Sequence, residues 1–211
     1  MARFHWMETA DRLEELLAGH AVEIDESRRC FIACDDPGVF LRPPPVYPIT
    51  DDVASAEAYL ERLDPDLGAV VVLLLQAGAS AMGYWRDDAL IRHKCLKRYV
   101  VRGQGRAQPL HAKTRGKSRY GSRLRLQNAK RQLEETNLKL REWWSEEGEP
   151  DRIFFSVPVR TWPELNAATP SPPFPRDDAR LVKIPRDVHV PNFEELARTW
   201  RFLGQGESSG R

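Results

Sequence analysis

The sequence predicts an α/β protein whose main domain is a mixed sheet of about five strands with helices on its faces. Three apolar segments follow one another closely between residues 69 and 101, and connections this short join antiparallel strands. A long amphipathic segment follows them. After it, strand and helix patterns alternate almost to the end of the chain, which is the order that places helices on the faces of a sheet.

Residues 1–65 are expected to form a small N-terminal α+β extension that precedes the main domain. Residues 1–20 have the amphipathic pattern of a helix, and residues 21–42 contain short strand patterns around a turn. Four prolines within residues 42–48 exclude a helix or a central strand there. Apolar residues at helical spacing in residues 51–63 predict a second helix before the main domain begins.

The first strand of the main domain is predicted at Ala69–Gln76, AVVVLLLQ. A continuous run of apolar and β-branched residues is typical of a central strand that is buried on both faces. Gly78 provides a turn to a second strand at Ala79–Arg86, and a tight turn leads to a third strand within Ala89–Val101. These three strands are therefore predicted to form two consecutive hairpins.

A long helix is predicted from Ser118 to Glu146 because apolar side chains recur there at alternating spacings of three and four. The predicted stripe consists of Leu126, Ala129, Leu133, Thr136, Leu140 and Trp143. Strands at Arg152–Val157 and Ala179–Ile184 then alternate with helices at Trp162–Ala168 and Asn192–Leu203. This succession fits a ribonuclease-H-like arrangement over residues 66–204, with residues 205–211 as a disordered tail.

Positive charge is concentrated in one stretch of a nearly neutral chain. The chain has 32 basic and 31 acidic residues, and fourteen of the basic residues, with no acidic ones, lie between Ala89 and Leu133. The rest of the chain therefore carries 18 basic residues against 31 acidic ones. Such a separation of charge indicates a polyanionic partner, and RNA is the first candidate.

Three short motifs within this basic stretch resemble those of a known family. They are a strand exit at His93-Lys94 and Lys97–Arg102, a Gly-x-x-Gln element at Gly105–Gln108, and a helix entry at Gly121–Arg125 followed by Asn128. From Ala69 to about Trp144 the chain resembles the release-factor-like (VLRF) domain of the ribosome-quality-control peptidyl-tRNA hydrolases and its stand-alone bacterial relatives. It resembles more distantly the middle domain of eukaryotic and archaeal class I release factors, whose Gly-Gly-Gln is here Gly105-Arg106-Ala107-Gln108.

The resemblance implies catalytic roles for four residues of the basic loop. Gln108 would orient the attacking hydroxyl or water with its uncharged amide, and Gly105 would let the backbone approach the RNA closely. Arg102 and Arg106 would neutralise charge that develops at the reacting group. Seven further basic residues are expected to contact phosphates and position the RNA: Lys97, Arg98, Arg115, Lys117, Arg119, Arg123 and Arg125.

Two reactions fit this resemblance. One is hydrolysis of the ester between nascent peptide and tRNA, and the other is cleavage of the tRNA backbone near its 3′ (CCA) end, which the eukaryotic relatives favour. The implied partners are the large ribosomal subunit and a peptidyl-tRNA. A non-catalytic tRNA- or ribosome-binding factor is the competing hypothesis, and a nuclease that acts on free RNA is a third.

The remaining features of the sequence predict neither a cofactor nor a membrane segment. The longest apolar run, Ala69–Leu75, is much shorter than the roughly 20 residues of a membrane span. The N-terminus has no apolar core of a signal peptide. Cys30 and Cys34 have no second pair of metal ligands near them in the sequence, so no metal site is expected. We expect a cytoplasmic monomer without cofactors.

Overall fold

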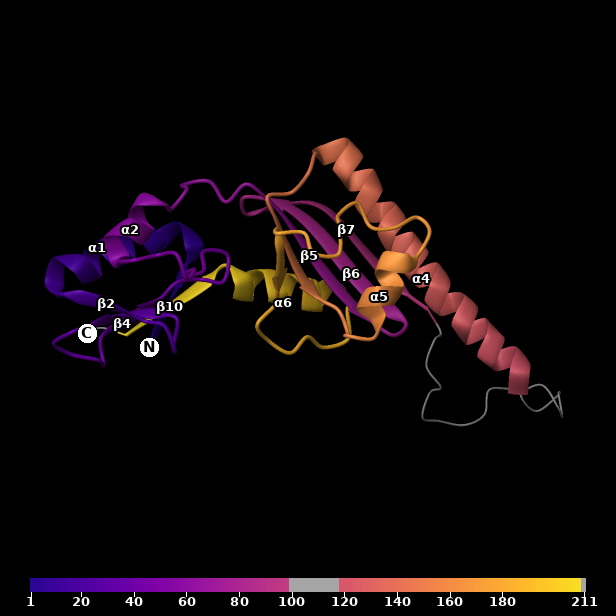
Figure 1. Ribbon diagram of the computed structural model, residues 1–211, viewed down its shortest axis with the longest axis horizontal. Helices are drawn as coiled ribbons and strands as arrows, with labels where there is room; N and C mark the ends of the chain where they lie inside the picture. The colour runs from indigo at the N-terminus through magenta and orange to yellow at the C-terminus, as the bar shows by residue number, and fades with distance from the viewer. Residues whose placement is uncertain (99–117, 210–211) are drawn as a thin grey trace. The chain divides into compact units, whose positions relative to one another are not determined.

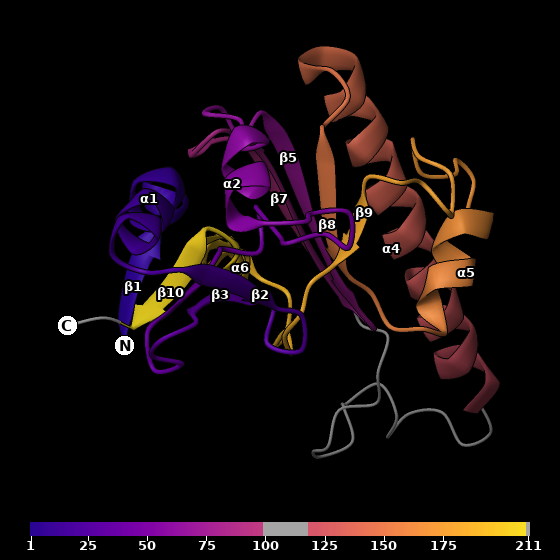
Figure 2. The ribbon, with the colours of Figure 1, turned by 60° about the vertical axis from the view of Figure 1, so that its left-hand side comes forward.

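The computed structural model describes residues 1–98 and 118–209, and it describes side chains in the same ranges except at 118–122. The chain forms two compact units (Figures 1 and 2). One unit comprises Met1–Leu67 and Ala197–Arg211, and the other comprises Gly68–Leu196.

The second unit contains a mixed five-stranded sheet. Its strands are β5 (Ala69–Gln76), β6 (Ala79–Arg86), β7 (Ala89–Lys97), β8 (Arg152–Ser156) and β9 (Leu181–Lys183). Their order across the sheet is β7-β6-β5-β8-β9. The first three strands pair antiparallel, whereas β8 and β9 join parallel to β5. This is the predicted ribonuclease-H-like arrangement, and β5 is the buried central strand.

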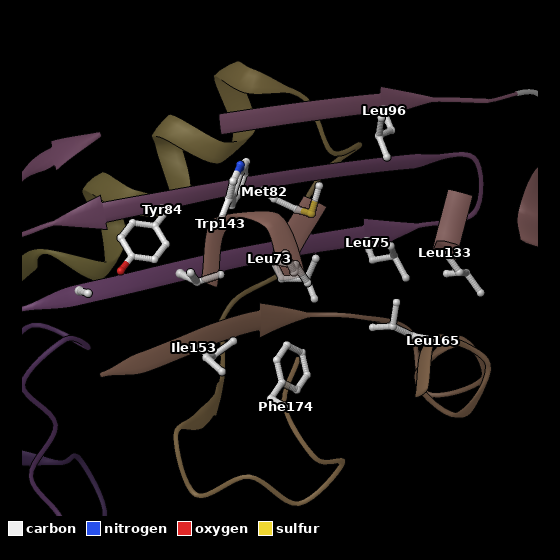
Figure 3. Packing of buried hydrophobic residues seen from close by; sticks show 13 residues of the cluster. Leu73, Leu75, Met82, Tyr84, Leu96, Leu133, Trp143, Ile153, Leu165 and Phe174 are labelled. Atoms are coloured by element: carbon white, nitrogen blue, oxygen red, sulfur yellow. The ribbon is translucent and has the colours of Figure 1, made fainter. Parts of the chain in front are cut away.

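Two helices, α4 (Ser118–Glu147) and α5 (Thr161–Ala167), cover one face of this sheet. Figure 3 shows the core between them, where alternate residues of β5, such as Leu73 and Leu75, meet Leu133 and Trp143 of α4. Met82 and Tyr84 of β6, Ile153 of β8 and Leu165 of α5 complete the layer. The apolar stripe predicted for the long helix therefore packs on the sheet from Leu133 onward.

The start of α6 (Phe193–Leu203) lies on the opposite face of the sheet. There the ring of Phe193 contacts the ring of His93 on β7, with 4.7 Å between centroids. Asn192 caps the helix, since its Oδ1 accepts a hydrogen bond of 2.7 Å from the Glu195 N–H. The segment before α6 is held at the end of β5, because the Gln76 side-chain amide donates a hydrogen bond to the backbone oxygen of Val188.

The first unit contains a second five-stranded sheet, which is antiparallel throughout. Its strands are β1 (Ala2–His5), β2 (Val22–Asp25), β3 (Cys30–Ala33), β4 (Phe40–Arg42) and β10 (Gln205–Ser209), in the order β1-β10-β4-β3-β2. Its helices are a 3-10 turn at Trp6–Glu8, α1 (Thr9–Gly19) and α2 (Ala56–Glu61). The N-terminal extension is thus α+β, as expected.

Two predictions for the chain ends are wrong. Residues 205–209 are a strand between β1 and β4 rather than a disordered tail, and residues 2–5 are a strand rather than the start of a helix. The polar segment QGESS is held by backbone pairing, which leaves no hydrophobic pattern in the sequence. At Gly206 the ring of Phe4 occupies the place that a β-carbon would fill, so the glycine is part of the packing.

Candidate nucleic-acid interface

The predicted RNA-binding stretch is flanked by two described elements, the end of β7 and the start of α4. Figure 1 shows the first turns of α4 running past the end of the sheet. From Ser118 to Gln132 the helix rises about 21 Å at 1.5 Å per residue. Leu126, which was predicted to face the core, is 74% exposed because the sheet does not extend this far. We call residues 118–131 the helical arm.

Basic side chains gather on these two elements. Lys97 at the end of β7 is exposed, as are Arg123, Lys130 and Arg131 on the helical arm. Arg125 is partly buried. The first acidic residue after the arm, Glu134, lies 3.6 Å from the Lys130 ammonium. Lys97, Arg123 and Arg131 are exposed and have no ion pair within the described residues.

Two arginines of the basic stretch are engaged within the protein instead. The Arg98 guanidinium forms an ion pair with the Glu135 carboxylate. The Arg92 guanidinium lies 2.7 Å from Glu147 and 3.4 Å from Glu146, and the Glu147 carboxylate raises the pKa of Arg92 further. Arg98 was expected to contact phosphate, but in this structure its charge is matched by Glu135.

The end of β7 and the helix α4 meet at one glycine, Gly78, in the turn between β5 and β6. The Gly78 N–H donates to Gln132 Oε1 at 2.9 Å, and Gln132 Nε2 donates to the Gln76 backbone oxygen at 2.9 Å. On its other side, the Gly78 oxygen accepts a hydrogen bond of 2.7 Å from the Arg98 N–H. Gly78 has a φ of 85°, a conformation that glycine adopts without strain.

Further contacts one turn along α4 reinforce this junction. Glu135, which pairs with Arg98, follows Gln132 by three residues and lies on the same face of the helix. Thr136 lies beside Ser80 of β6, with 3.2 Å between the two hydroxyl oxygens. Both hydroxyls and the Gln132 amide are buried. We call the contacts of Gln132, Glu135 and Arg98 around Gly78 the Gly78 anchor.

Sequence reasoning missed the Gly78 anchor. Gln132 stands in a run of polar residues on a surface-like helix, and no spacing rule marks it as buried. The one available signal was that Glu134 and Glu135 end the acid-free stretch, which placed two carboxylates next to a concentration of positive charge.

All four predicted catalytic residues, Arg102, Gly105, Arg106 and Gln108, lie outside the described residues. The predicted phosphate contacts Arg115 and Lys117 also lie outside them. Arg119 lies within α4, but its side chain also falls outside the described part. Their roles remain predictions.

The described residues offer no other reactive centre near the arm. Within residues 1–98 and 118–209 there is no cluster of three or more His, Cys, Asp or Glu side chains that could bind a metal. Partial desolvation of the exposed Cys95 thiol on β7 raises its pKa, which disfavours the nucleophilic thiolate. None of the helices in the described part of the chain has the length and apolarity of a membrane span.

A known protein family matches most of this chain. The model of the Bacteroidetes VLRF1 release factor family matches residues 70–209, which is more than half of the chain. The chain belongs to this release-factor family. The matched residues include the whole basic stretch and also β10, the strand at the end of the described chain.

The chain is also similar to a much longer curated protein and to one solved structure. It is 34% identical over 137 residues to the mouse (Mus musculus) tRNA endonuclease ANKZF1, a match that covers 63% of this chain and 18% of that protein. The chain therefore spans about a fifth of that relative. A solved structure, the Vms1 mitochondrial localization core, is similar with a TM-score of 0.54 at 13% identity, covering 96% of this chain and 82% of the other. That likeness shows a shared fold.

Proposed function

We propose that this VLRF1 protein is a ribosome-associated hydrolase that releases nascent chains from stalled large ribosomal subunits. Its substrate is a peptidyl-tRNA, and the bond cleaved is in the tRNA near its 3′ (CCA) end. Membership of a release-factor family supports the reaction class. The name of the mouse relative, a tRNA endonuclease, supports cleavage of the tRNA backbone over the peptide ester.

The observation that carries this proposal is that two described basic elements flank the Gly-x-x-Gln sequence along the chain. Lys97 ends the strand on one side of it, and Arg123 and Arg131 project from the helical arm on the other. RNA phosphates would be bound by these residues, together with Arg115, Lys117, Arg119 and Arg125 from the sequence.

Within this proposal, Gln108 orients the attacking group and Gly105 allows close approach to the RNA backbone. A ribose 2′-hydroxyl or a water attacks the phosphorus, and the bond to the leaving oxygen breaks. Arg102 or Arg106 stabilises the extra negative charge of the transition state. No cofactor takes part. The protein acts as a monomer in the cytoplasm, where its ribosomal substrate is located.

The test uses isolated large subunits that carry a stalled peptidyl-tRNA with labels on both the peptide and the tRNA. Wild-type protein is expected to release the peptide and shorten the tRNA at its 3′ end, and Gln108→Ala is expected to abolish both. Gln104→Ala provides a matched control, because it removes an identical side chain four residues earlier and should retain activity.

The outcomes separate the competing functions. Peptide release with a full-length tRNA would establish ester hydrolysis instead of tRNA cleavage. Salt-sensitive binding by wild type and Gln108→Ala with no release by either would leave the non-catalytic binding factor. Cleavage of free deacylated tRNA without ribosomes would support the plain nuclease.

A further inference from the structure

We propose that Gln132 and Glu135 are positioning residues, which hold the helical arm at a set angle to the end of β7. The expected effect on catalysis rests on the proposed function. The geometry does not, because it involves only described residues.

Gln132 joins α4 to the turn between β5 and β6. A buried amide that is left without partners is costly, so its two hydrogen bonds are strongly directional constraints. Gln132 is 3% exposed. Its oxygen accepts from the Gly78 N–H and its nitrogen donates to the Gln76 oxygen, each at 2.9 Å. Because both partners are backbone groups of one tight turn, the amide locks the rotation and the register of α4 against the sheet.

Arg98, directly after β7, joins the end of that strand to the same turn and to α4. The Arg98 N–H donates to the oxygen of the same Gly78, and the Arg98 guanidinium reaches across to Glu135 on α4. The two elements that flank the basic loop are therefore tied both to one residue and to each other. Glu135 completes a closed set of contacts around the junction.

At Gln132 and Leu133 the helix α4 becomes buried, and the arm continues for about 21 Å from Gln132 to Ser118. A small rotation of α4 at Gln132 displaces the far end of the arm several times farther than it displaces Gln132 itself. Because misplacing a reacting group by about 1 Å lowers catalysis by up to about a hundredfold, the anchor should affect the rate of release more than binding.

The chain offers a matched control on the same helix. Asn137 is also a fully buried amide, and its Nδ2 donates to two backbone oxygens, those of Leu165 at 3.0 Å and Pro170 at 2.8 Å. These bonds join α4 to α5 and to the segment after it, and they do not involve β7. Gln132→Met and Asn137→Leu each replace an amide by an apolar side chain of similar size and should lower the melting temperature comparably.

The geometric test measures the distance between spin labels at Cys95 on β7 and at Gln127→Cys on the arm, with Cys34 replaced by serine. Cys95 is exposed and Cys30 is buried, so Cys30 stays unlabelled. Wild type and Asn137→Leu should give narrow distance distributions, and Gln132→Met should give a broad or displaced one. An unchanged distribution in Gln132→Met would overturn the proposal. Glu135→Gln should also broaden or displace the distribution. Because the Glu135 side chain is one third exposed, this variant should fold, and it tests the positioning role if Gln132→Met does not fold.

The kinetic test uses the labelled large subunits at saturating protein. Gln132→Met should lower the rate constant of release by about ten- to a hundredfold, with the half-saturating protein concentration changed less than about twofold. Asn137→Leu should remain close to wild type. Equal losses in both variants would assign Gln132 a purely structural role. If the wild-type protein releases nothing, the proposed function fails, and the distance measurement still decides the positioning role.

Discussion

Asp178 and Arg180 form a hydrogen-bonded ion pair just before strand β9. The Asp178 carboxylate accepts hydrogen bonds from the Arg180 backbone N–H at 2.9 Å and from its guanidinium at 2.8 and 3.0 Å. The same guanidinium lies 2.7 Å from Glu149. This pair links the start of β9 to the segment before β8, and the Arg180 hydrogen bonds lower the pKa of Asp178.

The first prediction follows from the sign of that shift. A carboxylate with a lowered pKa in the folded state contributes stability above its unfolded pKa of about 3.9, and the contribution is lost as the pH falls through the folded pKa. Asp178→Asn should therefore reduce the free energy of unfolding at pH 7 by about 1–2 kcal/mol. Urea titrations should show the gap to wild type closing as the pH falls below the unfolded pKa and through the lower folded pKa of Asp178.

The neighbouring Asp177→Asn is the control for this prediction, because Asp177 is exposed and should change stability by less than about 0.5 kcal/mol. A gap between Asp178→Asn and wild type that stayed constant from neutral to acidic pH would contradict the assigned cause.

Gly83 on β6 carries the second prediction at the residue scale. The ring of Trp85, which is buried, lies where a β-carbon at Gly83 would be. Gly83→Ala should therefore destabilise the protein by about 1–3 kcal/mol through overpacking. Gly19 at the end of α1 has no heavy atom within 4 Å of the corresponding position, so Gly19→Ala should be neutral or slightly stabilising. Tryptophan fluorescence during urea unfolding measures both, and equal stability of the two variants would refute the packing argument.

At the scale of the element, α4 divides into a supported half and a projecting half. From Leu133 onward the predicted stripe, with Leu133, Leu140 and Trp143, is buried against the sheet, whereas the arm before it exposes Leu126 and basic side chains. The distribution of charge follows this division. Acidic residues begin at Glu134, where the sheet begins, and two of them pair back onto Lys130 and Arg98.

The third prediction uses this division. Each phosphate contact contributes about 0.7–0.9 to the slope of log affinity against log salt. Lys97→Ala or Arg131→Ala should reduce the slope for tRNA by about that amount, as measured by fluorescence anisotropy across a range of KCl concentrations. Arg92→Ala is the control, because Glu146 and Glu147 already match its charge. A loss of slope in Arg92→Ala equal to that in Arg131→Ala would contradict the division.

At the scale of the whole molecule, one unit is built from both ends of the chain. Strand β10 lies between β1 and β4. Without residues 205–209, β1 would therefore be separated from the other strands of this sheet. Backbone groups of β1 and β4 would lose their partners if β10 were removed. The family match to residue 209 agrees with β10 being part of the fold.

The fourth prediction is that a chain ending at Gly204 loses the order of this sheet. Amide hydrogens of Phe4 and Leu41 should exchange at least tenfold faster than in the full chain, because pairing with β10 protects this region. Hydrogen exchange read by mass spectrometry measures this. The amides of β5, in the other unit, serve as the internal control and should keep their protection. Unchanged protection of β1 would show that β10 is dispensable.

The sequence by itself determined the order of elements in the main sheet, the central place of β5 and the family. Continuous apolar runs, short turns and a sustained helical period are local signals, and each depends only on residues close together in the chain. The basic stretch was equally readable, because charge is a property of composition.

Only the tertiary structure decided where that helix stops being supported, which arginines are already paired and which polar residues are buried. Leu126 continues the apolar period of α4 but lies beyond the sheet, and Arg98 is engaged by Glu135, thirty-seven residues away. Gln132 and strand β10 are held by hydrogen bonds to backbone groups far along the chain. Backbone groups are the same in every residue apart from proline, so such pairings leave no mark in the sequence.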